Sequence, residues 1–181
     1  MNIIKLDAID STNSYLKKII LEKDVSDYTI VTANFQTEGK GQLGYMWESE
    51  DSKNLLCSIY KKDLGIKVED QFVLSMLVSL SIIRTLEKLN LPKLYIKWPN
   101  DIMSDNKKIC GILVENMVKQ NSIKESVIGI GLNVNQDTFK NLPNATSIKK
   151  IKGVAFNIDE LLNDLVNNIK KQFIDFNQSK I

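Results

Sequence analysis

One short segment combines residue types that suit chemistry on phosphates or amines. It spans Lys97–Gly111 and reads KWPNDIMSDNKKICG. Pro99 fixes one backbone dihedral just after an expected strand, which would hold Asn100 and Asp101 in a defined turn. The pair offers a donor, an acceptor and a charge for a ribose hydroxyl, a metal ion or a nucleophilic amine, and Lys108 can reach back from the next strand. Taken alone, however, such a segment is more often a simple Pro-Asn-Asp turn beside a solvated lysine, without a role in chemistry.

A second candidate is the long polar stretch Phe35–Lys53, which contains three closely spaced glycines. Gly39, Gly41 and Gly44 can present backbone amides to a phosphate, and Lys40 adds a positive charge. The Lys-Ser/Thr pair of a Walker A loop is absent. The sequence GKGQLG matches the GxGxxG pattern of a dinucleotide-binding turn, but the helix that must follow such a turn is not predicted here. On spacing alone, a flexible surface loop is the more common outcome.

Two shorter motifs can complete a site. In GIGLN, Gly129–Asn133, glycines alternate in an apolar strand, so one face lacks side chains and admits a ligand or a neighbouring backbone. Ordinary packing of the strand against a neighbour is equally compatible with this pattern. In STN, Ser11–Asn13, the hydroxyls can contact a ligand at a helix start, although N-capping is the commoner role.

Composition limits the chemistry that such a site can perform. The 181 residues include no histidine, which excludes Ser-His-Asp hydrolases, Cys-His proteases and most zinc enzymes. The net charge of +2 gives no electrostatic footprint for nucleic acid or an anionic membrane. Two distant cysteines, Cys57 and Cys110, fit a reducing compartment, and Cys110 is expected to be a small core residue. Lys5 and Asp7 stand where a signal peptide needs apolar residues, so we expect a cytoplasmic protein without a membrane or nucleic-acid partner.

The hydrophobic pattern predicts the elements that must position these motifs. A helix is expected after Asp10 or Ser11, a second over residues 70–89 and a third capped by Asn157. Strands are expected over residues 1–6, 28–34, 54–60, 94–97, 108–117 and 122–133, the last two forming a hairpin. Interleaved helices and hairpin-linked strands indicate a mixed-sheet α/β or α+β domain, not a Rossmann fold, and the length suits one domain over residues 1–181.

Taken together and in order, the motifs resemble the biotin–protein ligase family, also called biotin–[acetyl-CoA-carboxylase] ligase. That family carries Ser-Thr-Asn, a Gly-Arg-Gly-Arg-x-Gly-Arg-x-Trp loop, Lys-Trp-Pro-Asn-Asp, Lys-Leu/Ile-x-Gly-Ile-Leu-Val-Glu and Gly-x-Gly-Leu/Ile-Asn. This sequence reads STN, GKGQLGYMW, KWPND, KICGILVE and GIGLN in the same order, followed by PNATSI. The resemblance covers nearly the whole chain.

The resemblance implies a catalytic domain of the class II aminoacyl-tRNA-synthetase-like, biotin–lipoate ligase type, with a mixed, mostly antiparallel sheet and flanking helices. It implies that biotin and MgATP form biotinyl-5′-AMP, and that a lysine of a biotin carboxyl carrier protein then takes the biotin. Both steps depend on positioning and charge stabilisation, which suits a protein without histidine. Family members include monomers and homodimers.

The resemblance also assigns roles to individual residues. Ser11, Thr12, Asn13 and Gln36 are implied to bind the ureido ring of biotin, with Gly111 and Gly129 allowing close approach. The loop residues Gly39, Lys40, Gly41 and Gln42 are implied to wrap the biotin carboxylate and the adenylate phosphate. Lys97, Asn100 and Asn133 are implied to contact ATP.

Two residues of the KWPND segment and its neighbouring strand are implied to act in catalysis together with Lys40. Lys108 is implied to bridge the biotin carboxylate and the α-phosphate, and Asp101 to orient or deprotonate the incoming lysine. Trp47 is implied to anchor the loop structurally, or else to stack on a ligand. No metal ligands for Mg²⁺ are assigned.

The chain departs from the family pattern in the loop and in its extent. Lys40, Gln42 and Tyr45 occupy the family's arginine positions, so bidentate phosphate clamps are replaced. We expect no N-terminal DNA-binding domain and no C-terminal SH3-like barrel in this sequence. Lipoate–protein ligase or octanoyltransferase activity is one alternative, although those families usually carry a histidine or a late cysteine. A non-catalytic biotin- or adenylate-binding module is another, and the altered loop favours it.

Overall fold

The computed structural model describes residues 2–140 and 142–178, which form one eight-stranded sheet with helices on both faces. The strand order is β1-β2-β3-β8-β7-β6-β5, and β4 pairs with β8. The strands are β1 (Ile3–Ile9), β2 (Ile30–Gln36), β3 (Leu55–Lys61), β4 (Ile66–Lys67), β5 (Leu94–Lys97), β6 (Asp101–Ser104), β7 (Lys107–Lys119) and β8 (Ser122–Leu132). The helices are α1 (Thr12–Glu22), α2 (Phe72–Glu87), α3 (Ile148–Lys152) and α4 (Ile158–Gln178).

The sheet is mixed and mostly antiparallel, which confirms the predicted fold class. Only β1 and β2 pair in parallel, and α1 supplies the crossover between them. All other described strand pairs are antiparallel, including the long β7–β8 hairpin that was expected from the sequence. None of the described helices combines the length and the apolar composition needed to cross a membrane.

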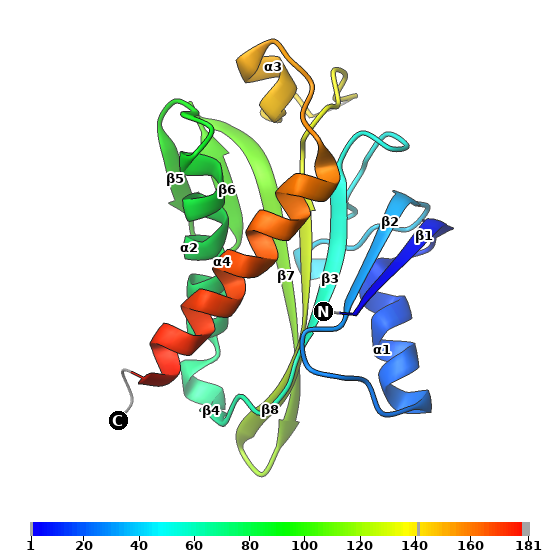
Figure 1. Cartoon of the computed structure of the whole chain (residues 1–181), viewed down its shortest axis with the longest axis vertical. Coiled ribbons are helices and arrows are strands. Elements are labelled where there is room, and N and C mark those ends of the chain that lie inside the picture. Colours follow the sequence, from blue (N-terminus) through cyan, green and yellow to red (C-terminus); the bar gives the residue numbers. More distant parts are fainter. Residues whose placement is uncertain (1, 141, 179–181) are drawn as a thin grey trace.

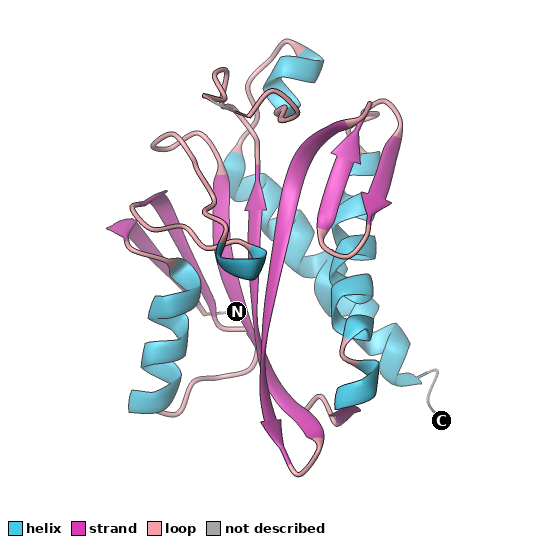
Figure 2. Cartoon of the chain, turned by 180° about the vertical axis from the view of Figure 1, so that it is seen from behind, coloured by secondary structure: helices cyan, strands magenta, loops and turns pink. Residues whose placement is uncertain are grey.

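Helices α2 and α4 pack together over one face of the sheet, and α1 covers the other face (Figures 1 and 2). The larger core lies under α2 and α4 and contains Leu74, Ile82, Leu165 and Phe173 among others. A smaller core lies under α1, where Leu16 and Ile19 pack on the other face of the central strands. This second face also carries the motifs that can do chemistry.

The alternating pattern of β8 explains its glycines. Ile128, Ile130 and Leu132 point into the larger core, because successive side chains of a strand point to opposite faces. The intervening Gly129 and Gly131 therefore lie on the α1 face, where the strand presents almost no side chain. One face of the GIGLN motif thus packs in the core, and its other face leaves room for another group to approach the strand closely.

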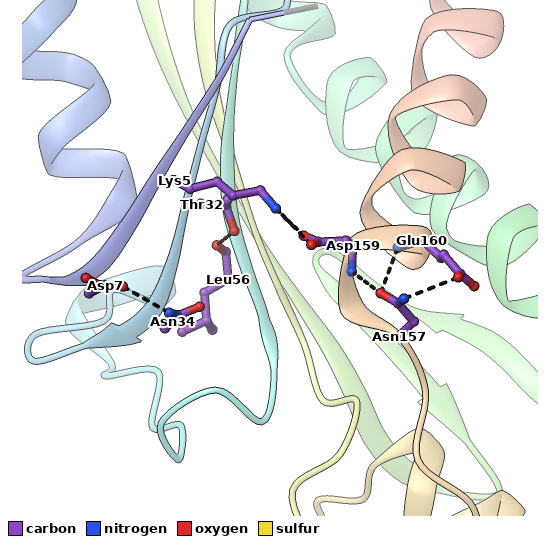
Figure 3. Close-up of polar contacts among 8 residues, drawn as sticks. All are labelled: Lys5, Asp7, Thr32, Asn34, Leu56, Asn157, Asp159 and Glu160. Carbon is purple, nitrogen blue, oxygen red and sulfur yellow. Dashed lines mark hydrogen bonds and ion pairs between the residues drawn. The ribbon is translucent and has the colours of Figure 1, made fainter.

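Polar contacts fix the start of α4 against the edge of the sheet (Figure 3). Asn157 Oδ1 accepts hydrogen bonds from the backbone N–H groups of Asp159 and Glu160, which confirms the predicted cap. Lys5 of β1 forms an exposed ion pair with Asp159, at 2.8 Å. The N-terminal strand and the last helix are thereby joined although they lie far apart in sequence.

Several element predictions were wrong or incomplete. Asp101 begins β6 instead of lying in the Pro99 turn, because it pairs with Lys97 on one side and Gly111 on the other. Strand β4 and helix α3 were not predicted, since both are short and depend on tertiary contacts. Strands β1 and β2 extend to Ile9 and Gln36, further than predicted, and Met1 of the predicted first strand lies outside the described residues.

Candidate functional site

A cavity of about 350 Å³ opens on the α1 face of the sheet. Its walls come from the start of α1, the glycine-containing loop, the KWPND turn and the central strands β7 and β8. Most of the residues that the sequence motifs predicted to form a site line this cavity. They are Ser11, Thr12, Asn13, Gln36, Lys40, Gly41, Gln42, Asn100, Asp101, Lys108, Gly111 and Gly129. Segments spread across more than 100 positions of the chain therefore meet at one place, within the size range of small-molecule sites.

One end of the cavity is a buried polar network at the start of α1. Ser11 caps the helix, and its Oγ accepts from Ser14 N, as predicted. Gln36 Oε1 accepts from both the backbone N–H and the hydroxyl of Thr12, at 2.8 and 3.0 Å. Ser58 Oγ lies 2.7 Å from Thr12 Oγ1 and 2.5 Å from Asn13 Oδ1. This end offers hydrogen-bond donors and acceptors in fixed positions away from bulk water.

The glycines of the floor make room for side chains of this chain. A Cβ atom at Gly129 would overlap the carboxamide of Asn13, and one at Gly111 would lie 2.7 Å from the Trp47 ring. A Cβ at Gly131 would also approach Trp47 more closely than real Cβ atoms approach a ring. Both glycines therefore make room for side chains that themselves line the cavity, namely Trp47 at Gly111 and Asn13 at Gly129. The close approach of biotin to Gly111 and Gly129 stays a prediction.

The glycine-containing loop is ordered by its own backbone. Trp47 N donates to Gly39 O at 2.8 Å, and Gly41 N donates to Tyr45 O at 2.7 Å. A short 3₁₀ turn over Gln42–Gly44 closes the tip. Gly39 is not among the residues that line the cavity, and a Cβ atom there would overlap the carbonyl oxygen of Trp47, so a glycine at this position lets the loop close. Trp47 anchors the loop against the sheet, as the resemblance implied.

Two cations flank the cavity. Lys108 Nζ lies 2.7 Å from Asp101 Oδ1 and 5.5 Å from the centre of the Trp47 ring. Its side chain is 35% exposed and that of Asp101 is 18% exposed, so the pair is accessible but partly shielded. Lys40 Nζ donates to Ser14 Oγ at 2.7 Å, which holds this lysine beside the start of α1.

A second cavity of about 280 Å³ adjoins the first one. Lys108, Asp101 and Trp47 line both cavities, so the ion pair stands at their junction. Lys97 and Asn133 line only the second cavity, whereas Asn100, which we expected beside them, lines the first. Asn133 is 3% exposed. Its Oδ1 accepts no hydrogen bond from the described residues, which leaves a buried acceptor available to a ligand amine.

The buried thiols take no part in this chemistry. Cys110 is fully buried in the core as predicted, and burial raises its pKa well above the ordinary value. Burial also raises the pKa of Cys57, to about 12. Both thiols therefore stay protonated at neutral pH and are poor nucleophiles.

Sequence reasoning missed two polar residues of the network. Ser58 lies in the wholly buried strand LLCSIYK, and a serine inside such an apolar strand is a signal that could have been used. Glu115 ends the KICGILVE motif, but no role was assigned to it. It accepts hydrogen bonds from Asn13 and from Lys17.

Comparison with known proteins agrees with this geometry. The model of the biotin/lipoate A/B protein ligase family matches residues 6–133. The bifunctional ligase/repressor BirA of Bacillus spizizenii is 28% identical over 182 residues, covering 97% of this chain and 54% of that protein. BirA of Escherichia coli is 36% identical over 129 residues, covering 71% and 39%. The chain thus spans about half the length of the curated relatives it matches.

A solved structure supports the same relationship. Biotin protein ligase from Aquifex aeolicus, in complex with biotin and ATP, superimposes with a TM-score of 0.82 at 30% identity. The match covers 97% of this chain and 71% of that chain. Together with the family match and the shared cavity motifs, this shows that the chain belongs to the biotin/lipoate A/B protein ligase family as a biotin–protein ligase catalytic domain.

Proposed function

We propose that this domain joins biotin to ATP and then transfers the biotin to a lysine of a biotin carboxyl carrier protein. In the first step a biotin carboxylate oxygen attacks the α-phosphorus of ATP, and the bond to the leaving pyrophosphate breaks. In the second step the carrier amine attacks the biotinyl carbonyl, an amide forms, and AMP leaves with the bonding electrons. The amine loses its proton during this step.

One observation carries the proposal: Lys108 stands at the junction of two cavities. The first cavity has a polar end suited to a cyclic urea, and the second has Lys97 and the buried acceptor Asn133 Oδ1. A carboxylate from one side and a phosphate from the other repel each other as they approach. A fixed cation between them offsets this repulsion without reorganisation.

The remaining residues divide between the two substrates. Ser11, Thr12, Asn13 and Gln36 bind the ureido ring, and Lys40 with the loop residues Gly41 and Gln42 surrounds the biotin carboxylate and the phosphate. Lys97 and Asn133 contact the nucleotide. Asp101, paired with Lys108 at the junction, orients or deprotonates the carrier lysine.

Magnesium enters this scheme with the nucleotide. Among residues 2–140 and 142–178 no group of three or more Cys, Asp or Glu side chains is placed to hold a metal ion. Mg²⁺ in nucleotide sites is usually held by substrate phosphates and water with one or two carboxylates. Asp101 and Glu48 are the carboxylates that line the second cavity, and the ion would neutralise phosphate charge there.

A blot distinguishes this function from its alternatives. The chain is incubated with ATP, biotin and a carrier domain, and biotinylated carrier is detected with streptavidin. A blank blot with intact biotin binding would favour a non-catalytic module, and modification only with lipoate or octanoate would favour that transferase. BirA of Bacillus spizizenii and the Aquifex aeolicus enzyme are both biotin ligases, and this similarity favours biotin as substrate.

The replaced arginines give a testable consequence for the intermediate. Gln42 lines the cavity where the family pattern has arginine, so a bidentate phosphate contact is lost. The variant Gln42→Arg is expected to lengthen the lifetime of bound biotinyl-5′-AMP by about tenfold, the worth of one charge-assisted hydrogen bond. Release of radiolabelled adenylate on a desalting column measures this. Equal release rates for Gln42→Arg and the wild type would contradict the prediction, and exposed Lys18→Arg is the matched control.

A further inference from the structure

Glu115 of β7 ties two residues of α1 to the sheet beside the cavity. Its carboxylate accepts from Asn13 Nδ2 at 2.8 Å and from Lys17 Nζ at 2.5 Å. Asn13 and Lys17 lie four residues apart and so share one face of α1. Glu115 and Gly129 also lie on one face of the sheet, since Gly129 pairs with Leu113, two residues before Glu115. The carboxylate therefore stands next to the carboxamide that covers Gly129.

The Asn13 carboxamide is enclosed on three sides. Its group fills the space that a Cβ at Gly129 would need, Ser58 Oγ lies 2.5 Å from Oδ1, and Glu115 binds Nδ2. Asn13 is 3% exposed, so the amide has little freedom to move. Nitrogen and oxygen of a carboxamide have nearly the same shape, so enclosure alone does not decide which one faces which neighbour.

The charge of Glu115 decides this orientation. An ionised carboxylate only accepts hydrogen bonds, so the amide must turn its NH₂ group toward it and its oxygen toward Ser58. Partial burial by itself raises the pKa of Glu115, but hydrogen bonds from Lys17 and Asn13 outweigh it and hold the pKa below the ordinary value. Glu115 is therefore ionised, and acceptor-only, throughout the neutral range.

We propose that Glu115, held by Lys17, is a positioning residue that fixes the Asn13 carboxamide and thereby makes this end of the cavity selective for a cyclic urea. The inference rests on the proposed function, because it concerns the ureido ring of biotin. A cyclic urea presents one carbonyl acceptor flanked by two N–H donors in a rigid plane. A binding site that pairs with such a pattern loses affinity when one of its own groups is reversed.

The isosteric variant Glu115→Gln tests this directly. Glutamine can either donate or accept, so it no longer forces one orientation of the Asn13 amide. The Kd and KM for biotin are expected to rise about tenfold, the range of one misplaced hydrogen bond. The KM for ATP and the kcat at saturating biotin should stay within twofold. Desthiobiotin, which keeps the ureido ring but lacks the sulfur, should lose affinity by the same factor.

Two controls separate positioning from a structural role. Glu22→Gln removes the carboxylate from another lysine–glutamate pair of α1, the exposed Lys18–Glu22 pair, and should leave biotin affinity unchanged. Adding Glu115→Gln to Asn13→Ala should cause no further loss, because the amide to be oriented is already gone. A full tenfold loss in that double variant would overturn the proposal.

The remaining outcomes are also decisive. If the wild type binds neither biotin nor desthiobiotin in calorimetry, the proposed function itself fails. If the wild type binds both and Glu115→Gln binds them equally well, positioning by Glu115 is wrong while the function stands. Should Glu115→Gln not fold, Lys17→Met releases the carboxylate without removing it. Its Kd for biotin is expected to rise about threefold with ATP binding unchanged, and an unchanged biotin Kd would contradict the proposal.

Discussion

Replacing Lys108 with methionine is expected to lower the rate of biotin adenylation at least about a hundredfold, with the fold retained. Removing one preorganised donor from a charge-stabilising site typically costs about 10² to 10³ in rate. Lys108 is the cation at the junction of both cavities, and methionine keeps an unbranched chain, one atom shorter, without the charge. Biotin-dependent release of pyrophosphate from ATP measures the first step alone.

The neighbouring lysine supplies the control for this experiment. Lys107 begins β7 next to Lys108 but is exposed and lines neither cavity, so Lys107→Met should keep wild-type adenylation. Lys108→Met leaves the partly buried Asp101 carboxylate without its cation, which can destabilise the protein. The double variant with Asp101→Asn removes that carboxylate charge as well. A low adenylation rate in the double variant would therefore come from loss of the Lys108 cation and not from loss of stability. Retention of more than about a tenth of the wild-type rate in Lys108→Met would show that the junction cation is not central.

Substituting Gly131 by alanine is expected to destabilise the protein by about 1–3 kcal/mol, the usual effect of overpacking. A Cβ at this position would overlap the Trp47 ring, which is rigid and lies against the strand. The ring must move, and the loop that it anchors moves with it. Biotin binding should therefore fall together with the urea midpoint, measured by calorimetry and circular dichroism.

A second substitution should repair the first. Trp47→Leu removes the atoms that the new Cβ would meet, so the stabilities of Gly131→Ala and Trp47→Leu are expected to be non-additive. The double variant should be more stable than the sum of the two single effects predicts. Strict additivity would indicate that Trp47 does not occupy the space above Gly131.

The sequence allowed the sheet class and most long elements to be predicted because their periodicities are strong. The hairpin of residues 107–132 and the helix over residues 72–87 each carry clear apolar patterns. Strand β6 was missed because Asp101–Ser104 has turn-forming residues at both ends, and only pairing with β5 and β7 makes it a strand. Short elements of this kind are decided by tertiary contacts, which local propensity does not contain.

The same distinction applies to the site. Motif order was enough to group Ser11, Gln36, Lys108 and their neighbours, and the structure brings these residues to one cavity. It was not enough to tell that the close approach at Gly129 is made by Asn13. Such pairings depend on how α1 lies across the sheet, and this is fixed by packing between segments more than 100 residues apart.

The loop of residues 39–47 links the stability of the protein to its affinity for a ligand. Backbone hydrogen bonds join Gly39 to Trp47 and Gly41 to Tyr45, and the Trp47 ring packs against Gly111 and Gly131. Contacts within the protein therefore offset part of the conformational entropy that is lost when this loop is ordered. A segment that is held by its own contacts adds less to the entropic cost of binding. We expect variants that weaken these contacts to bind biotin less tightly, because ligand binding must then supply more of the free energy that orders the loop.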